Sequence, residues 1–137
     1  GVDGSASNDS GHMLNEARQA MLLQRVMKTG DALTARQSLA IATRGGAAGL
    51  GRDDIGQLAP GYAADIAAFD CRGIDFACAA WDLLAGLLFC GSTKTSYTII
   101  NGKIIVDQGH LVTMDMPKLL ENHHAMTADL MRKAQWA

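Results

Sequence analysis

The chain has 137 residues, of which 48% are hydrophobic and 19% charged, and its formal net charge of −2 fits an ordinary globular chain. This length supports a hydrophobic core, but it excludes a complete eight-unit α/β barrel, which takes about 250 residues. The 12 basic and 14 acidic side chains are interspersed, so we expect no binding to nucleic acid or to an anionic membrane. No apolar run reaches the roughly 18 residues of a membrane span.

The first two predicted elements are a loop and a helix. Residues 1–11 are small, polar and rich in glycine, which is typical of a loop. Small and apolar side chains recur at helical spacing over residues 13–28, so we expect a helix there. Leu22 and Val26 lie near the face opposite to the main apolar stripe, and this helix should therefore be covered on two sides.

A second helix is predicted by a capping box. Thr34 and Gln37 have the spacing at which each side chain satisfies a backbone N–H of the other, which predicts a helix over residues 35–44. The pair Gly45-Gly46 should stop or bend this helix. After Gly51 the helical periodicity gives way to short apolar runs, so we expect a domain boundary there.

The middle of the chain predicts short strands and one apolar helix. Residues 55–58 form a short extended run, Ala59-Pro60-Gly61 has the composition of a turn, and residues 64–69 resemble a buried strand. Residues 79–89 are continuously apolar, and a short helix is the simplest interpretation. Cys71, Cys78 and Cys90 are odd in number and widely spaced. We expect buried, reduced thiols and a cytoplasmic protein, since the first residues show no secretory signal.

The strongest local signal is a β-hairpin. Residues 96–100 and 103–106 are rich in β-forming side chains and flank Asn101-Gly102, the dipeptide that favours a tight hairpin turn. A further turn follows at residues 107–109 and a brief extension at residues 111–113. Asp115 should cap a last helix that has Pro117 in its first turn and runs toward Trp136.

Few residues have the spacing that catalysis requires. No two histidines are placed to share a metal ion, and cysteine pairs, nucleophile elbows and phosphate-binding loops are missing. The remaining candidate is Asp3, a carboxylate followed by a polar loop and a helix, although Asp-Gly is also a common turn dipeptide. The other candidates are interpreted as surface or structural residues: His12, His123 and His124 as solvated, and Asp65 as a hydrogen-bond acceptor for a neighbouring turn.

The loop after Asp3 leaves two interpretations open. Ser7 and Asn8, together with Asp9, either line a substrate pocket or cap the helix that starts near Met13. Capping is favoured on the residues alone, because serine, asparagine and aspartate are the preferred capping residues.

Several segments together resemble the metal-dependent amidohydrolase superfamily, in the aminohydrolase branch that deaminates purine, pyrimidine and triazine rings. Within that branch the similarity is to 8-oxoguanine deaminases and hydroxychlorotriazine hydrolases. The segments are residues 1–9, Glu16-Ala17-Arg18, Thr34-Ala35-Arg36, residues 41–47, residues 55–66 and residues 100–103. They extend over nearly the whole chain.

The resemblance implies an α/β fold of which this chain is the carboxyl-terminal part. Residues 1–51 would be the last strand end and the last helices of a TIM barrel. Residues 52–113 would be part of a small β-sandwich domain, and residues 114–137 a terminal helix that packs back on the barrel. The earlier strands of such a barrel carry a His-x-His pair and a further histidine, so the chain reads as a fragment that is inactive alone. The resemblance also allows the whole enzyme to be a homo-oligomer.

The resemblance also implies the chemistry. Asp3 would be both metal ligand and proton shuttle, on one divalent ion that is Zn²⁺ or alternatively Fe²⁺. Such an ion lowers the pKa of its bound water to about 7, which gives a hydroxide that attacks the ring of a small heterocyclic substrate. The alternative hypothesis is a non-catalytic module of the same fold that binds a small molecule or a protein. A third is a chain that completes a site across a subunit boundary.

Overall fold

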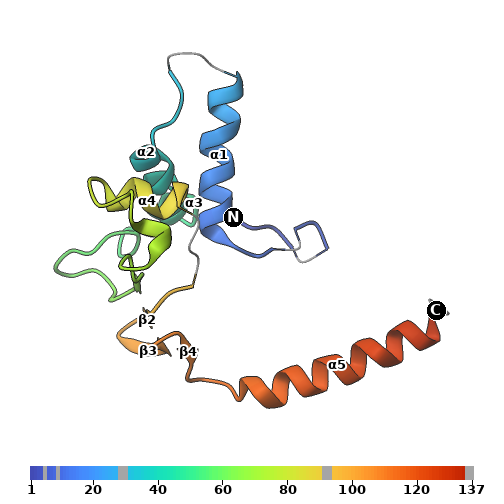
Figure 1. Cartoon of the computed structure of the whole chain (residues 1–137). Helices are drawn as coiled ribbons and strands as arrows, with labels where there is room; N and C mark the ends of the chain where they lie inside the picture. Colours follow the sequence, from blue (N-terminus) through green and yellow to red (C-terminus); the bar gives the residue numbers. More distant parts are fainter. Residues whose placement is uncertain (5, 9, 28–30, 91–93, 135–137) are drawn as a thin grey trace.

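The computed structural model describes residues 1–4, 6–8, 10–27, 31–90 and 94–134, and shows a group of helices, a small sheet and a long terminal helix (Figure 1). In chain order the elements are α1 (Met13–Met27), α2 (Ala35–Ala40), the π-helical turn η1 (Ile41–Gly45), α3 (Gly46–Gly49), β1 (Ile66–Ala68), the 3₁₀ turn η2 (Ile74–Phe76), α4 (Leu83–Phe89), β2 (Tyr97–Ile100), β3 (Lys103–Asp107), β4 (His110–Leu111) and α5 (Met116–Lys133).

Helix α1 is confirmed and forms one side of the core. Its Ala17 and Met21 are buried against Ala35 of α2 and Leu88 of α4. The hydroxyl of Ser38, itself buried, donates to the carbonyl of Ala17 and ties α2 to α1. This contact fixes the first half of α1 to its neighbours.

The second side of α1 is not covered, which corrects the expectation of cover on both sides. Leu22 and Val26, the two residues for which cover was expected, are 39% and 85% exposed. Within the described residues α1 packs mainly against α2, η1 and α4, and the buried cluster that it forms with α2 and α4 lies on the face that carries Ala17 and Met21.

The capping box is confirmed, but the helix that it begins is longer than predicted. Thr34 accepts from the backbone of Gln37, and the Gln37 side chain accepts from the backbone of Thr34. Gly45 and Gly46 keep helical backbone angles, so the helix continues through η1 into α3 instead of stopping at residue 44. The pair of glycines therefore permits a change of helix type.

The predicted extended run at residues 55–58 is wrong, because Gly56 packs against α3. Gly56 has a φ of +89°, and a Cβ built on it would lie 2.9 Å from the Cβ of Ala47. That close approach bends the chain toward the helix. The turn that follows is confirmed, since Tyr62 N–H donates to the Ala59 carbonyl at 3.1 Å and Gly61 has a φ of +86°.

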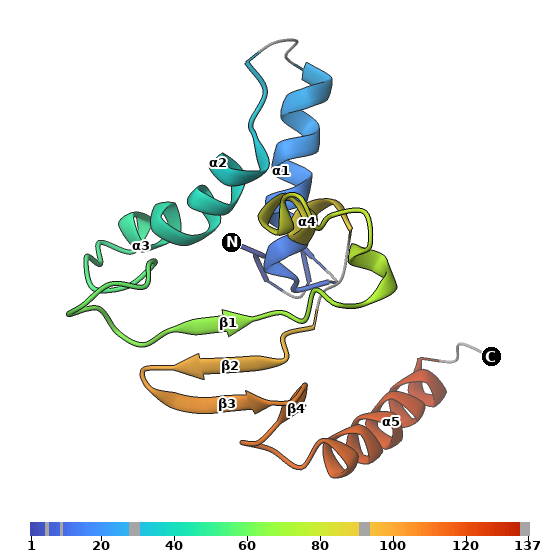
Figure 2. The same cartoon turned by 60° about the vertical axis from the view of Figure 1, so that its left-hand side comes forward.

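The sheet is an antiparallel meander in the order β1-β2-β3-β4, and Figure 2 shows it below α1, α2 and α4. The predicted hairpin is confirmed: Asn101 and Gly102 have φ values of 47° and 75°, as a tight turn of this kind requires. Strand β1 is shorter than the predicted run of residues 64–69, and β4 begins one residue before the predicted extension at residues 111–113 and ends at Leu111.

Helix α4 begins later than predicted, because Asp82 caps it. The Asp82 carboxylate accepts from Ala85 N–H at 3.1 Å, while residues 74–76 form η2. Cys78 lies in the turn that follows η2 and is exposed, whereas Cys71 and Cys90 are partly buried. The expectation of three buried thiols is therefore wrong for Cys78.

Helix α5 is confirmed and stands apart from the other helices (Figures 1 and 2). Asp115 caps it by accepting from Lys118 N–H at 3.0 Å, and Pro117 lies in its first turn. None of its residues is buried. Trp136 lies outside the described residues. Among the helices described, none is long and apolar enough to cross a membrane.

Candidate functional site

Asp3 lies at the start of an exposed turn. Its φ is 62°, in the left-handed region that aspartate tolerates better than most residues, and its Oδ1 accepts from Gly4 N–H at 2.8 Å. The sequence interpretation treats this segment as the end of a strand. Residues 1–4 form no strand in the structure, and among the described residues no strand pairs with them.

The loop after Asp3 folds back on Gly4. The backbone N–H groups of Ser7 and Asn8 both donate to the Gly4 carbonyl, at 2.9 and 3.0 Å. The Asn8 side chain then donates through Nδ2 to Glu16 Oε1 at 2.7 Å. Since Glu16 belongs to the first turn of α1, this bond fastens the loop to the helix.

Asn8 does not cap α1, which corrects the favoured interpretation for this residue. Its Oδ1 accepts from the backbone N–H of Ser10 at 3.2 Å and lies 3.3 Å from the Ser10 hydroxyl. The start of α1 is capped instead by His12, whose Nδ1 accepts from Asn15 N–H at 3.4 Å. Ser7 is exposed, and Asp9 lies outside the described residues.

Asp3 has the chemistry of one ligand of a metal site. An aspartate oxygen is a suitable ligand for zinc or iron, and among the described residues no donor contacts Oδ2 of Asp3, which is therefore available. The described part of the chain holds no group of three or more His, Cys, Asp or Glu side chains that could bind a metal ion. His123 and His124 are exposed on α5. Asp3 can thus contribute to a metal site but cannot form one with these neighbours.

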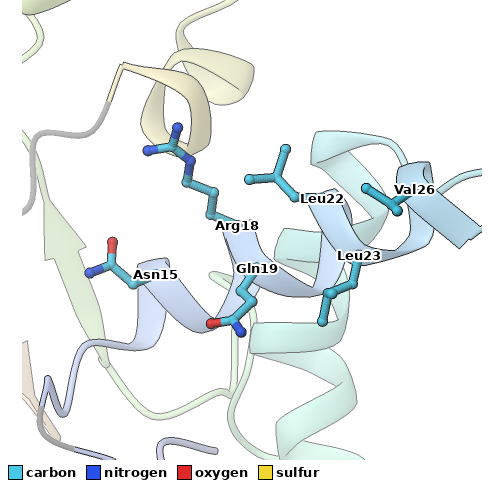
Figure 3. Close-up of a pocket in the computed structure, with 6 residues that line it drawn as sticks. All are labelled: Asn15, Arg18, Gln19, Leu22, Leu23 and Val26. Carbon is cyan, nitrogen blue, oxygen red and sulfur yellow. The ribbon is translucent and has the colours of Figure 1, made fainter.

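A shallow groove runs along the uncovered face of α1 (Figure 3). It has a volume of about 490 Å³ and is lined by Asn15, Arg18, Gln19, Leu22, Leu23 and Val26, all from this one helix. Polar side chains lie at one end and apolar ones at the other. Arg18 Nε is buried, with no hydrogen-bond partner among the described residues. A depression formed by a single helix lacks the walls that enclose a small molecule, so it is better suited to pack against another element.

The shifted pKa values belong to surface ion pairs. Arg72 donates two side-chain hydrogen bonds to Asp70, at 2.8 and 2.6 Å, and these bonds, with a third from its own backbone N–H, hold the pKa of Asp70 well below its usual range. Arg52 lowers the pKa of Asp54 in the same way. Each arginine lies two residues from its carboxylate, and both pairs are exposed. These shifts mark local pairing, not a catalytic cluster.

Sequence reasoning missed the role of Glu16. Its bond to Asn8 spans eight residues and joins a loop to a helix, so no periodicity reveals it. Asp65, in contrast, was interpreted correctly as a structural acceptor, since its Oδ1 accepts from Asn101 N–H at 2.7 Å.

Comparison with known proteins places these residues in context. Residues 1–105 match the Amidohydrolase family. The chain is 41% identical over 130 residues to 8-oxoguanine deaminase of Pseudomonas aeruginosa, covering 95% of this chain and 29% of that enzyme. It is 40% identical to 5-methylthioadenosine/S-adenosylhomocysteine deaminase of Pelotomaculum thermopropionicum, covering 88% of this chain and 28% of that enzyme.

Solved structures give the same result. Atrazine chlorohydrolase of Arthrobacter aurescens, complexed with zinc, is 38% identical with a TM-score of 0.82 and covers 89% of this chain and 28% of its own. An adenosine deaminase of Xanthomonas campestris with bound zinc is 31% identical with a TM-score of 0.86, over 97% of this chain and 30% of its own. The chain therefore spans less than a third of the length of these relatives.

Proposed function

Since the chain belongs to the amidohydrolase family, we propose that it is the carboxyl-terminal portion of a metal-dependent enzyme that deaminates a nitrogen heterocycle by hydrolysis. The observation that carries this proposal is the similarity of nearly the whole chain to a deaminase, with 41% identity over 130 residues. The exposed carboxylate of Asp3, with one oxygen free of hydrogen bonds from the described residues, is consistent with it.

The proposed architecture assigns each part of the chain to a region of the larger enzyme. Residues 1–51 belong to the metal-dependent barrel, residues 52–113 to a small β-domain, and residues 114–137 to a terminal helix that packs back on the barrel. Two uncovered surfaces support this assignment. They are the groove on α1, in which Arg18 Nε has no hydrogen-bond partner from the part of the chain that the structure describes, and the apolar side chains of α5, such as Leu119 and Leu130, which are 43% and 65% exposed.

Asp3 is assigned two roles, as one metal ligand and as the carrier of a proton. The chemistry that a divalent ion supplies there, as Zn²⁺ or alternatively Fe²⁺, is acidification of a bound water to a pKa of about 7. The Asp3 carboxylate accepts a proton from the attacking water and delivers it to the departing nitrogen. One C–O bond forms, one C–N bond breaks, and the products are a carbonyl-bearing ring and ammonia.

The loop after Asp3 is assigned to the edge of the substrate pocket. Ser7 is the better candidate for a substrate contact, because its side chain is exposed. The amide of Asn8 is already engaged with Glu16 and Ser10, so it has less capacity to bind a ligand. A purine-like or triazine-like ring is the proposed substrate, and the three unpaired cysteines favour a cytoplasmic enzyme.

The proposal is tested by ammonia release from the full-length polypeptide loaded with zinc. Candidate substrates are 8-oxoguanine, guanine, 5-methylthioadenosine and hydroxytriazines that carry an unsubstituted amino group. We expect at least one ring to release ammonia in amounts equal to the ring consumed, with loss of activity on chelation and recovery on adding zinc back. A zinc-loaded protein that releases no ammonia from any of them would favour the non-catalytic binding module.

A further inference from the structure

We propose that the hydrogen bond between Asn8 and Glu16 positions Asp3, so that Glu16 is a positioning residue for the reaction although it lies on a helix and not in the loop. This inference rests on the role proposed above for Asp3. In this proposal Asn8 acts through the backbone of the loop, because it holds Gly4, which in turn is bound to the Asp3 carboxylate.

The connection from Glu16 to Asp3 consists of three hydrogen bonds in series. Asn8 Nδ2 donates to Glu16 Oε1 at 2.7 Å, Asn8 N–H donates to the Gly4 carbonyl at 3.0 Å, and Gly4 N–H donates to Asp3 Oδ1 at 2.8 Å. Ser7 N–H adds a second bond to the Gly4 carbonyl at 2.9 Å. Both backbone polar groups of Gly4 are thus engaged, one toward Asn8 and one toward the carboxylate.

Helix α1 is a firm anchor at Glu16. The next residue, Ala17, is 4% exposed, and its carbonyl accepts from the buried hydroxyl of Ser38. One turn further, Met21 is fully buried. Glu16 therefore projects from the part of α1 that is packed against α2 and α4, and its bond to Asn8 is partly buried and charge-assisted.

Asp3 needs this support because of its backbone. A φ of 62° is unfavourable for a residue with a Cβ, so the segment tends to relax unless its surroundings hold it. The loop beyond Gly4 provides those surroundings only while Asn8 is fixed. A carboxylate that binds a metal and moves a proton must keep its orientation, since small misplacements reduce the rate strongly.

The test uses Asn8→Asp, Glu16→Gln and their combination in the full-length polypeptide. Asn8→Asp alone places a second carboxylate beside that of Glu16, so the two groups repel each other and the hydrogen bond is lost. In the double variant the glutamine amide donates to the new carboxylate, so the bond re-forms in the opposite direction. We expect Asn8→Asp to lower kcat and zinc affinity by about 10- to 100-fold with little change in KM, and the double variant to recover most of both.

A readout without substrate accompanies the kinetics. Hydrogen exchange of a peptide over residues 1–12 should be faster in metal-free Asn8→Asp than in the wild type, and slower again in the double variant. Asn122→Asp, the same change at an exposed asparagine of α5, is the matched control and should leave kcat, zinc affinity and exchange unchanged. Asn8→Ala removes the bond without adding charge and replaces Asn8→Asp if that variant does not fold.

The outcomes separate this inference from the function on which it rests. The positioning role would be overturned if Asn8→Asp kept the wild-type kcat per bound zinc, even with a lower melting temperature. It would also be overturned if the double variant recovered neither kcat nor zinc affinity. If the wild type deaminates none of the rings, the proposed function fails. Zinc affinity and exchange still decide whether Glu16 holds the loop of Asp3.

Discussion

Asp65 Oδ1 accepts a hydrogen bond from Asn101 N–H at 2.7 Å, so the residue before β1 holds the turn between β2 and β3. The neighbouring Ala64 carbonyl accepts from Gly102 N–H at 3.1 Å. Both backbone N–H groups of the hairpin turn are therefore bound by the segment that leads into β1. This arrangement joins residues far apart in sequence at one end of the sheet.

Replacing Asp65 with alanine should destabilise the protein. The change removes the acceptor of the Asn101 N–H, and at this exposed position we expect a loss of about 1 kcal/mol in the free energy of unfolding. Asp65→Asn keeps an oxygen acceptor and should lose less. Denaturant unfolding provides the measurement, with Asp53→Ala at an exposed aspartate as the control. Equal stability of Asp65→Ala and Asp53→Ala would show that the bond contributes nothing.

Gly56→Ala should destabilise the contact between the 55–58 segment and α3. The new Cβ would meet the Cβ of Ala47 at 2.9 Å and the Thr43 carbonyl at 3.1 Å, on a backbone with a φ of +89°. Overpacking alone costs about 1–3 kcal/mol. Gly49→Ala is the control, since its Cβ meets nothing within 4 Å in a helix where alanine is preferred. Thermal unfolding should show a lower midpoint for Gly56→Ala only.

The ion pair of Asp70 and Arg72 predicts a pH-dependent contribution to stability. Arg72 lowers the pKa of Asp70 in the folded state, so the contribution is fully present above the unfolded pKa, about 4, and is lost as pH falls toward the folded value. Arg72→Gln should therefore be less stable than the wild type at pH 7. The difference between the two proteins in the free energy of unfolding, measured with denaturant, should become smaller below pH 4. Arg44→Gln, at an exposed arginine with no ion pair among the described residues, serves as control. A difference that stays constant with pH would contradict this assignment.

The isolated 137-residue chain should associate through the uncovered face of α1. Leu23 and Val26 are 53% and 85% exposed there, on a face where apolar groups gain by excluding water. Light scattering should show an average molecular mass that rises with protein concentration. Replacing both residues with lysine should make this rise smaller. A chain that remains monomeric at high concentration would count against the proposal that this face packs on another part of a larger enzyme.

Some of the fold could be predicted from sequence because the bonds concerned are local. The capping box of Thr34 and Gln37, the Asn101-Gly102 turn and the cap at Asp115 each join residues within three positions, and all are confirmed. The sequence left open whether the helix stops or bends at Gly45-Gly46, and the structure shows that it continues into α3, where Ala47 packs against Gly56.

The candidate site was predicted only in part. The Asp3 loop could be singled out as a candidate. The Asn8–Glu16 hydrogen bond could not be predicted, because it joins a loop to a helix over eight residues, and helix and turn propensities describe only shorter separations. The other ligands expected for a metal site are not among the described residues. Sequence patterns and local structure therefore cannot show the complete arrangement around Asp3.

The most direct test of the central claim is to measure bound zinc and ammonia release together in Asp3→Asn of the full-length polypeptide. The asparagine keeps the shape of the side chain but removes its charge and its capacity to carry the proton. We predict weaker zinc binding and ammonia release at the background level, while Asp53→Asn behaves as the wild type. Normal zinc content with normal turnover in Asp3→Asn would contradict the assignment of Asp3 as ligand and proton carrier.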